Sequence, residues 1–511
     1  MHTSRRTRPA LPSAPGCADT MRTPLARHLL LALPLGLLAL SGCKPVGPNY
    51  QQPGFQAPPA YKETGASSVV PPPNPQGGSW KPADPSDGML KGKWWEVYQD
   101  PQLNQLEERL STTNVQLKQA LDNYLAAREE VAVVRANFYP TLGATAQITR
   151  SRGSYNQPGN IPASKLQNNV FLLEGQATWE PDFFGRIRRS VEQARANAQL
   201  SAADMANLDL TLHAEMATDY YELRGLDSQI KLLRATVADM QGQLELTQRL
   251  LAGGVATAVD VAQAQTQLEN VSAQLVETGV ARAQFEHAIG TLGNFDLSTF
   301  AVPFSPIDQP LPQVPLGVPS QLLERRPDIA AAERAVDAAN AGIGIAISAF
   351  YPSIPLIATG GFESIHPGTW IQGPSSLWSL GAQAAELLFD AGQRHAITNI
   401  ARLSYDAQVN GYRNSVFQAF SDVEDQLSSL RILEQEAGVE QLAVASAQHS
   451  YDLSNQRYKG GVTSYLEVLT AEQTLILDQS TAISLQTRQF AASVGLVRSL
   501  GGGWDVTQLP R

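Results

Sequence analysis

The chain has little cysteine and little charge. Only Cys17 and Cys43 occur in 511 residues, so a disulfide framework or a cysteine-based metal site after residue 43 is excluded. Charged residues make up 17% of the chain, against about 25% in an average soluble domain. The net charge is −10 and no stretch is rich in Lys or Arg, which argues against a surface that follows nucleic-acid phosphates.

Long apolar runs and catalytic motifs are also missing after residue 43. No apolar run there reaches the roughly 18 residues of a membrane-spanning helix, so a bundle of membrane helices is excluded, whereas alternating strands are not. There is no His-Glu-x-x-His motif and no phosphate-binding loop. We therefore expect no enzyme and no metal or cofactor site, and we interpret the histidines as ordinary surface or helix-face residues: His213, His287, His366, His395 and His449.

The first 43 residues have the parts of an export signal. A basic start from Met21 precedes an apolar stretch from Leu29 to Leu40, and small residues follow. Leu40-Ser41-Gly42-Cys43 is similar to a bacterial lipobox, which implies that Cys43 is lipidated and becomes the new N-terminus. The resemblance to lipoproteins also implies that Lys44 directs the chain to the outer membrane. The alternative is a buried hydrophobic helix followed by a chance cysteine.

The rest of the chain contains an internal repeat. Phe138-Tyr139-Pro140 recurs as Phe350-Tyr351-Pro352, and Gly253-Gly254-Val255 recurs as Gly460-Gly461-Val462 at nearly the same spacing. Proline is concentrated before the first half and between the halves, as is typical of tethers and linkers. The sequence predicts an N-terminal extension and lipoprotein signal peptide at 1–43, a Pro-rich tether at 44–93, a first repeat at 94–301, a Pro-rich linker at 302–319, a second repeat at 320–504 and a C-terminal tail at 505–511.

Each half is predicted to contain one very long helix and two shorter ones. The long patterns run without proline for about 67 residues, or roughly 100 Å at 1.5 Å per residue. Alanine at contact positions lets such helices pack closely. With helices alone, a coiled-coil rod would fit the sequence as well. The long helices are expected at 185–251 and 392–458, and the shorter ones, stacked end to end beside them, at 101–137, 257–292, 320–349 and 464–498.

Two alternating segments follow the first helix of each half. Segments of about ten residues with one apolar and one polar face are typical of a β-barrel with lipid outside and water inside. Four strands cannot close a barrel, and open edges are not stable in lipid, so we expect an oligomer: a dimer for eight strands or a trimer for twelve. The apolar positions of the four segments are Leu142, Ala144, Ala146 and Ile148; Leu173, Ala177 and Trp179; Leu356, Ala358 and Phe362; and Trp378, Leu380, Ala382 and Ala384.

Several motifs are shared with a known family. They are Cys43-Lys-Pro-Val-Gly-Pro-Asn-Tyr50, Trp94-Trp95, Leu322-Leu-Glu-Arg-Arg-Pro-Asp328-Ile, Phe350-Tyr-Pro-Ser, Leu388-Phe-Asp-Ala-Gly392-Gln and Gly501-Gly-Gly-Trp504. With these motifs the chain resembles the TolC-like outer-membrane efflux proteins over residues 43–504. The branch that it resembles is the NodT-type lipoproteins of the resistance-nodulation-division (RND) efflux systems.

The resemblance implies an α+β membrane protein that works as a homotrimer. Long antiparallel helices would form part of an α-barrel, and four strands per chain would contribute to one 12-stranded outer-membrane β-barrel. It also implies a lipid-anchored outer-membrane location with a long periplasmic extension. The implied partners are a periplasmic adaptor (membrane fusion) protein, an inner-membrane RND-type transporter and outer-membrane lipid, with no nucleic acid.

The Gly-Gly turns and two acids are the candidate functional positions. Asp260 and Glu467 each lie seven residues after the first Gly of a turn. An acid there can simply stabilise a helix dipole, and the turns can be purely structural. In a trimer, however, each position supplies three carboxylates that repel one another and attract cations. The resemblance implies a periplasmic gate of Asp260, Tyr458, Thr463 and Glu467, and adaptor-contact tips at Gly254, Val255, Ala256, Gly461 and Val462.

We therefore interpret the chain as the outer-membrane exit duct of a tripartite efflux pump. It would passively conduct drugs or toxic small molecules through a trimeric tunnel with a periplasmic gate. Two alternatives stay open: the outer-membrane duct of a type I protein secretion system, and a lipid-anchored structural coiled-coil rod. The lipid anchor and Arg325-Arg326-Pro327-Asp328 favour efflux, whereas a rod would contain no β-structure.

Overall fold

The computed structural model describes residues 44–64 except 56 and 59, then 92–156, 167–312, 314, 322–504 and 509. Several predictions concern residues outside this part of the chain. They are the signal peptide with the lipidated Cys43, much of the tether and of the linker, and nearly all of the C-terminal tail.

Both halves contain the same order of helices and strands. The long helices α4 and α8 each have 67 residues and therefore extend for about 100 Å. None of the helices in the described residues combines the length and apolar content needed to cross a membrane. The first half contains η3 (Trp94–Tyr98), α2 (Pro101–Thr113), α3 (Val115–Ala136), β1 (Thr141–Arg152), β2 (Gln167–Trp179), α4 (Arg186–Ala252) and α5 (Ala258–Leu292), and the second contains α6 (Leu322–Arg325), α7 (Pro327–Ser348), β3 (Leu356–Ser364), β4 (Ser376–Ala382), α8 (Gln393–Lys459) and α9 (Tyr465–Ser499).

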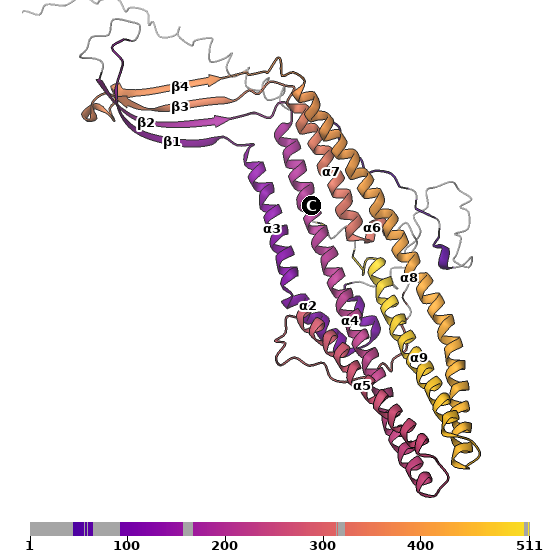
Figure 1. Ribbon diagram of the computed structural model, residues 1–511. Helices are drawn as coiled ribbons and strands as arrows, with labels where there is room; N and C mark the ends of the chain where they lie inside the picture. The colour runs from indigo at the N-terminus through magenta and orange to yellow at the C-terminus, as the bar shows by residue number, and fades with distance from the viewer. Residues whose placement is uncertain are drawn as a thin grey trace, which may run out of the picture.

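The helices form an elongated bundle with the sheet at one end and the two Gly-Gly turns at the other (Figure 1). The long helix α4 contacts α3 in the half near the sheet and α5 in the half near the turns, and α8 contacts α7 and α9 in the same way. The two halves are joined because α4 also packs against α7 and α9. The shorter helices are thus stacked end to end beside the long ones, as the sequence predicts.

The first short helix of each half is broken, and the predictions of one helix over 101–137 and one over 320–349 are wrong on this point. In the second half Arg326, with ψ of 121°, separates α6 from α7. Asn114 has ψ of 128° and separates α2 from α3. Its side-chain oxygen accepts hydrogen bonds from the Gln116 N–H (2.8 Å) and the Leu117 N–H (3.1 Å), which caps α3. Its amide donates to the Leu292 carbonyl (2.9 Å) at the end of α5. These bonds satisfy groups at two helix ends and so compensate for the interrupted helix.

The four strands form one antiparallel sheet in the order β1-β2-β3-β4, which confirms the predicted strands. Because side chains alternate between the faces of a sheet, adjacent rows of the register face opposite sides. Leu142 and Leu380, in an apolar row, are 82% and 75% exposed in the single chain. The presence of this sheet argues against the coiled-coil rod. One row contains Leu142, Ala177, Ala358 and Leu380, and the next contains Gly143, Gln176, Thr359 and Ser379.

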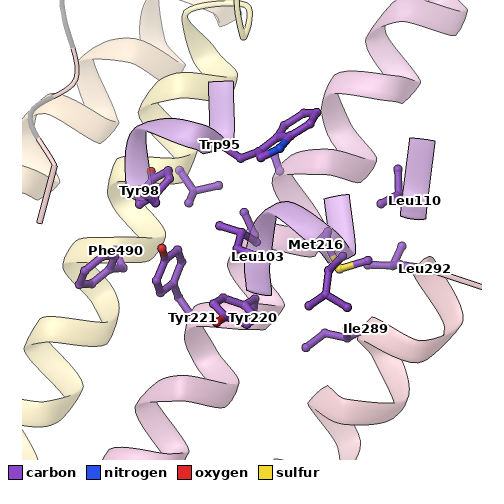
Figure 2. Close-up of a cluster of buried hydrophobic side chains, with 14 of the residues drawn as sticks. Trp95, Tyr98, Leu103, Leu110, Met216, Tyr220, Tyr221, Ile289, Leu292 and Phe490 are labelled. Atoms are coloured by element: carbon purple, nitrogen blue, oxygen red, sulfur yellow. The ribbon is translucent and has the colours of Figure 1, made fainter. Parts of the chain in front are cut away.

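The largest hydrophobic core lies near the middle of α4 (Figure 2). Leu103 of α2 and Ile289 of α5 are fully buried against this part of the long helix. Tyr221 of α4 stacks on Phe490 of α9, with 4.4 Å between the ring centroids. Burying one such side chain stabilises the fold by about 1.5–3 kcal/mol. This core therefore fixes the ends of the short helices near the middle of α4.

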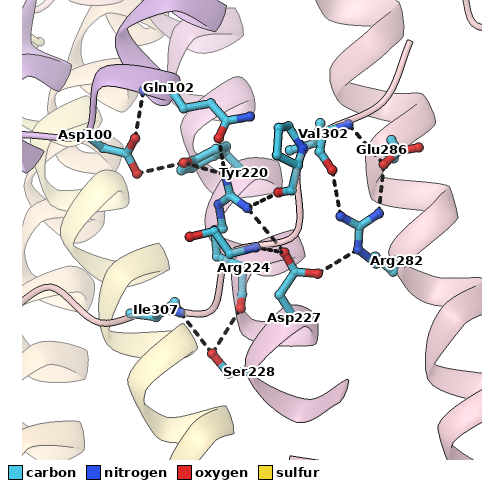
Figure 3. Close-up of polar contacts among 12 residues, drawn as sticks. Asp100, Gln102, Tyr220, Arg224, Asp227, Ser228, Arg282, Glu286, Val302 and Ile307 are labelled. Atoms are coloured by element: carbon cyan, nitrogen blue, oxygen red, sulfur yellow. Dashed lines mark hydrogen bonds and ion pairs between the residues drawn. The ribbon is translucent and has the colours of Figure 1, made fainter. Parts of the chain in front are cut away.

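A buried ion network lies beside this core (Figure 3). The carboxylate of Asp227 in α4 is fully buried and accepts hydrogen bonds from Arg224 Nη1 (3.2 Å) and from Arg282 Nε of α5 (2.6 Å). Arg224 also donates to the Pro303 carbonyl (2.6 Å), and Arg282 donates to the Val302 carbonyl (2.8 Å). Arg282 also pairs with Glu286 (2.8 Å), so two arginines and two carboxylates balance in charge and join α4, α5 and the loop that follows α5.

The described part of the predicted tether lies against the helices. The Val46 N–H donates to the Phe184 carbonyl (3.0 Å), directly before the start of α4. Further along, Glu63 pairs with Arg431 near the middle of α8 (2.6 Å). The segment thus runs from the sheet end of the bundle to its middle, and its first described residues are placed next to the sheet.

Candidate gate and tip surface

The two Gly-Gly turns have the same backbone geometry. In the first turn Gly254 has φ of +79°, and the Val255 N–H donates to the Leu250 carbonyl (2.8 Å). In the second turn Gly461 has φ of +68°. A positive φ and a hydrogen bond back to the third-last residue of the helix are the features of a glycine C-cap. The repeated glycines therefore allow the chain to reverse direction within a few residues after α4 and after α8.

The predicted tip residues lie together at the end of the bundle. Val255 and Val462 are 63% and 71% exposed, Gly254 and Gly461 are exposed, and Ala256 is half-buried. A Cβ atom at Gly461 would lie 3.8 Å from Val255 Cγ1, so the two turns are neighbours. The tip thus presents two exposed valines on adjacent turns.

Asp260 forms a reciprocal cap at the start of α5. Its carboxylate accepts hydrogen bonds from the Thr257 N–H (2.7 Å) and the Thr257 hydroxyl (2.8 Å), and its own N–H donates to Thr257 Oγ1 (3.2 Å). This is a capping box, which satisfies N–H groups that the first turn of a helix leaves free. Asp260 is half-buried, so the residue is still partly accessible.

Glu467 makes different contacts from Asp260, although it occupies the matching position in α9. Its carboxylate pairs with Arg457 of α8 (3.3 Å), and both side chains are about half exposed, at 50% and 57%. The N-cap residue of α9, Ser464, makes no side-chain capping bond.

The described residues contain no group of three or more His, Cys, Asp or Glu side chains placed to hold a metal ion.

Tyr458 is buried between the two turns' helices. Its hydroxyl donates to Thr247 Oγ1 of α4 (3.1 Å), and its ring lies 5.4 Å from that of Tyr465. Burial raises the pKa of the Tyr458 hydroxyl, and the charge of Asp260 raises it further. The structure therefore brings Tyr458 and Asp260 into electrostatic contact.

Thr463 lies between the second Gly-Gly turn and α9. Its Oγ1 is buried and finds no hydrogen-bond partner in the part of the chain that the structure describes. A buried hydroxyl without a hydrogen bond destabilises the folded state by about 1–3 kcal/mol. We therefore expect a water molecule or a neighbouring chain to bond to it.

Three contacts of the gate residues were not expected from the sequence. The pairing of Asp260 with Thr257 could have been read from the pattern Thr-x-x-Asp, which marks a capping box. The ion pair of Arg457 and the hydrogen bond of Thr247 join residues on different helices, or on opposite sides of a turn. No local pattern in the sequence identifies such contacts.

Comparisons with known proteins match nearly the whole chain. A model of the family described as outer membrane efflux protein matches residues 107–292 and 318–502. The probable efflux pump outer membrane protein TtgC of Pseudomonas putida is 31% identical over 477 residues, which covers 93% of this chain and 96% of TtgC. The solved outer-membrane channel OprN gives a TM-score of 0.81 at 28% identity over 90% of this chain and 99% of OprN. The open-state MtrE channel of Neisseria gonorrhoeae gives a TM-score of 0.76 at 27% identity over 90% of this chain and 98% of MtrE.

Proposed function

Because the chain belongs to the outer membrane efflux protein family, we propose that three copies form the passive exit duct of a tripartite efflux pump. The protein is an outer-membrane efflux channel with a trimeric fold. We further propose that the duct catalyses no reaction and that it receives small toxic molecules from an inner-membrane RND-type transporter. A periplasmic adaptor would join the duct to that transporter.

The observation that carries the proposal is the sheet with two different faces. One face has apolar rows such as Leu142 and Leu380, and the other has polar rows such as Thr359 and Ser379. The outer edges of β1 and β4 have no strand partner among the described residues of a single chain, and unpaired strand edges are unfavourable in lipid. Three copies would pair these edges and close twelve strands around a polar interior.

A lipid anchor at Cys43 would fit this arrangement. The hydrogen bond from Val46 to Phe184 places the described start of the chain at the sheet end of α4. A lipidated Cys43, three residues before Val46, would therefore lie near the membrane surface. Acyl chains add membrane affinity of about 0.8 kcal/mol per buried methylene group.

The tip would form the gate and the adaptor contact. In three copies, Asp260 and Glu467 would supply six carboxylates near the end of the tunnel, where they would attract cations. Tyr458 would hold α8 against α4 through Thr247. The Thr463 hydroxyl, which has no partner among the described residues, would bond water or the next copy. The tips at Gly254, Val255, Ala256, Gly461 and Val462, which are exposed except for the half-buried Ala256, would bind the adaptor.

The proposed function is tested with the purified full-length protein and with a deletion strain. In planar bilayers we expect water-filled pores, and deletion of the gene should make cells sensitive to toxic small molecules. Secreted proteins should be unchanged, which separates an efflux duct from a secretion duct. A protein that forms no pores, or a deletion that alters only the secretome, would contradict the proposal.

The gate assignment predicts an effect on ion selectivity. Asp260→Asn combined with Glu467→Gln should reduce cation selectivity and change the conductance, because six carboxylates become neutral in a trimer. Asparagine keeps an oxygen that can accept the Thr257 hydrogen bonds, so the cap of α5 should persist. The matched control is Glu269→Gln, an exposed acid in the middle of α5. If the double variant and the control both conduct like the original protein, the gate assignment is wrong.

A further inference from the structure

Glu472 in α9 is a buried carboxyl group that lacks a full set of partners. The residue is 3% exposed, and its Oε2 accepts no hydrogen bond from the described residues. An ionised carboxylate in such a place is unfavourable unless a counter-charge or several donors surround it. The surroundings of Glu472 therefore decide whether it is charged.

The long helices place acceptors and a second acid around Glu472. The negative charge of Asp239 in α4 opposes the ionisation of Glu472. Gln243, one turn further along α4, has a buried Oε1 that is also unpaired among the described residues. Its Nε2 donates to the hydroxyl of Tyr451 of α8 (3.3 Å). Burial raises the pKa of Tyr451, and the negative charge of Glu472 raises it further. Neither α4 nor α8 thus supplies a counter-charge to Glu472.

Apart from Asp239, no charged group of the described residues shifts the pKa of Glu472. On α5, Gln267 accepts a hydrogen bond from Gln473, the residue after Glu472 (3.1 Å). On α9 itself, Tyr465 lies two turns before Glu472 and is affected by its charge. The site therefore has an excess of acceptors and of negative charge. A proton on Glu472 removes the buried charge and adds a donor, which is what this site lacks.

The titration of Glu472 follows from this environment. Burial, and then the charge of Asp239, raise its pKa from 4.5 to about 7. Because the packed state holds the proton more tightly than an opened state would, packing is most favourable below pH 4.5. That advantage is lost as the pH rises through about 7, where the packed group ionises.

Glu472 is placed to affect the gate. Val468 and Tyr465 precede it by one and two turns of α9 and share its buried face. Both belong to a cluster with Tyr458, the candidate gate residue, and with Ala264 of α5. A change in the packing of α9 around Glu472 would therefore reach the contact between Tyr458 and Tyr465.

We propose that Glu472 is a pH-sensing positioning residue of the periplasmic gate. The neutral carboxylic acid lets α9 pack against α4 and α8, and loss of its proton draws water into this contact and loosens the tip. The inference rests on the proposed function, because it requires a tunnel with a gate.

The test is the pH profile of conductance for full-length trimers in planar bilayers. The original protein should open more often as the pH rises, with a midpoint near 7 and an increase of up to about tenfold per pH unit. Glu472→Gln, which resembles the neutral acid, should lose this step and stay at the low-pH level. The matched control Glu436→Gln, at an exposed position of α8, should keep the step.

A second measurement covers the case in which Glu472→Gln does not fold. A spin label at Val462→Cys, in protein with an intact Glu472, should report longer distances between the tips above pH 7 than below it. A pore that conducts with no step near neutral pH, or a step that persists in Glu472→Gln, would overturn the inference and leave the proposed function intact. Absence of any pore at every pH would instead refute the proposed function.

Discussion

Replacing Asp227 by alanine is expected to destabilise the folded protein by about 3–5 kcal/mol, because it leaves buried guanidinium groups without their counter-charge. Asp227 is fully buried and accepts hydrogen bonds from Arg224, Arg282 and the Ser305 N–H. Without it, α4, α5 and the loop after α5 lose their common partner. The measurement is the temperature at which detergent-solubilised trimers dissociate, which should fall clearly for Asp227→Ala.

The control for this prediction is an ion pair with similar chemistry at the surface. Glu108 of α2 pairs with Lys93, and both side chains are more than half exposed. Exposed pairs of this kind contribute only about 0–1 kcal/mol, so Glu108→Ala should dissociate close to the original temperature. Equal effects of Asp227→Ala and Glu108→Ala would show that the buried network does not hold the helices together.

The second large effect concerns the two faces of the sheet. Ala358 and Thr359 are neighbours in β3, and they lie on opposite faces. Ala358 is paired with Leu380 in an apolar row, whereas Thr359 is paired with Ser379, with a hydrogen bond of 2.9 Å between their hydroxyls. An arginine on the lipid side of a membrane strand costs about 2–4 kcal/mol at mid-depth, and each trimer would contain three.

Ala358→Arg should therefore prevent assembly, whereas Thr359→Arg should insert and form pores. The readout is the amount of folded trimer in purified outer membranes. For Thr359→Arg we also expect weaker cation selectivity, because the added charge would line the lumen. If Ala358→Arg inserts as well as Thr359→Arg, the apolar face does not contact lipid.

The elements of the fold could be predicted well, and the reason is their strong patterning. Uninterrupted helical periodicity located α4 and α8, and alternation located all four strands, including the short β4. The comparisons confirm the family that the shared motifs indicated. The break at Asn114 was missed because its hydrogen bond to Leu292 joins residues that are far apart in the sequence.

The candidate site could be predicted only in part. The repeated Gly-Gly turns and acids identified the tip, and the structure places Gly254, Val255 and Gly461 on neighbouring turns. The gate role of Asp260 and Glu467 stays a prediction, although the two acids differ in their bonding. The burial of Glu472 could not be foreseen, because it depends on where three helices meet.

Three copies of the chain are proposed to close one cylinder by pairing β4 of one chain with β1 of the next. Cysteines at Leu142→Cys in β1 and Leu380→Cys in β4 can be joined by a short thiol cross-linker in intact membranes. Within one chain these positions are three strand spacings apart, about 14 Å, so a shorter cross-linker joins only different chains. We expect a gel ladder that ends at three linked chains. A ladder that ends at two chains, or monomers alone, would contradict it.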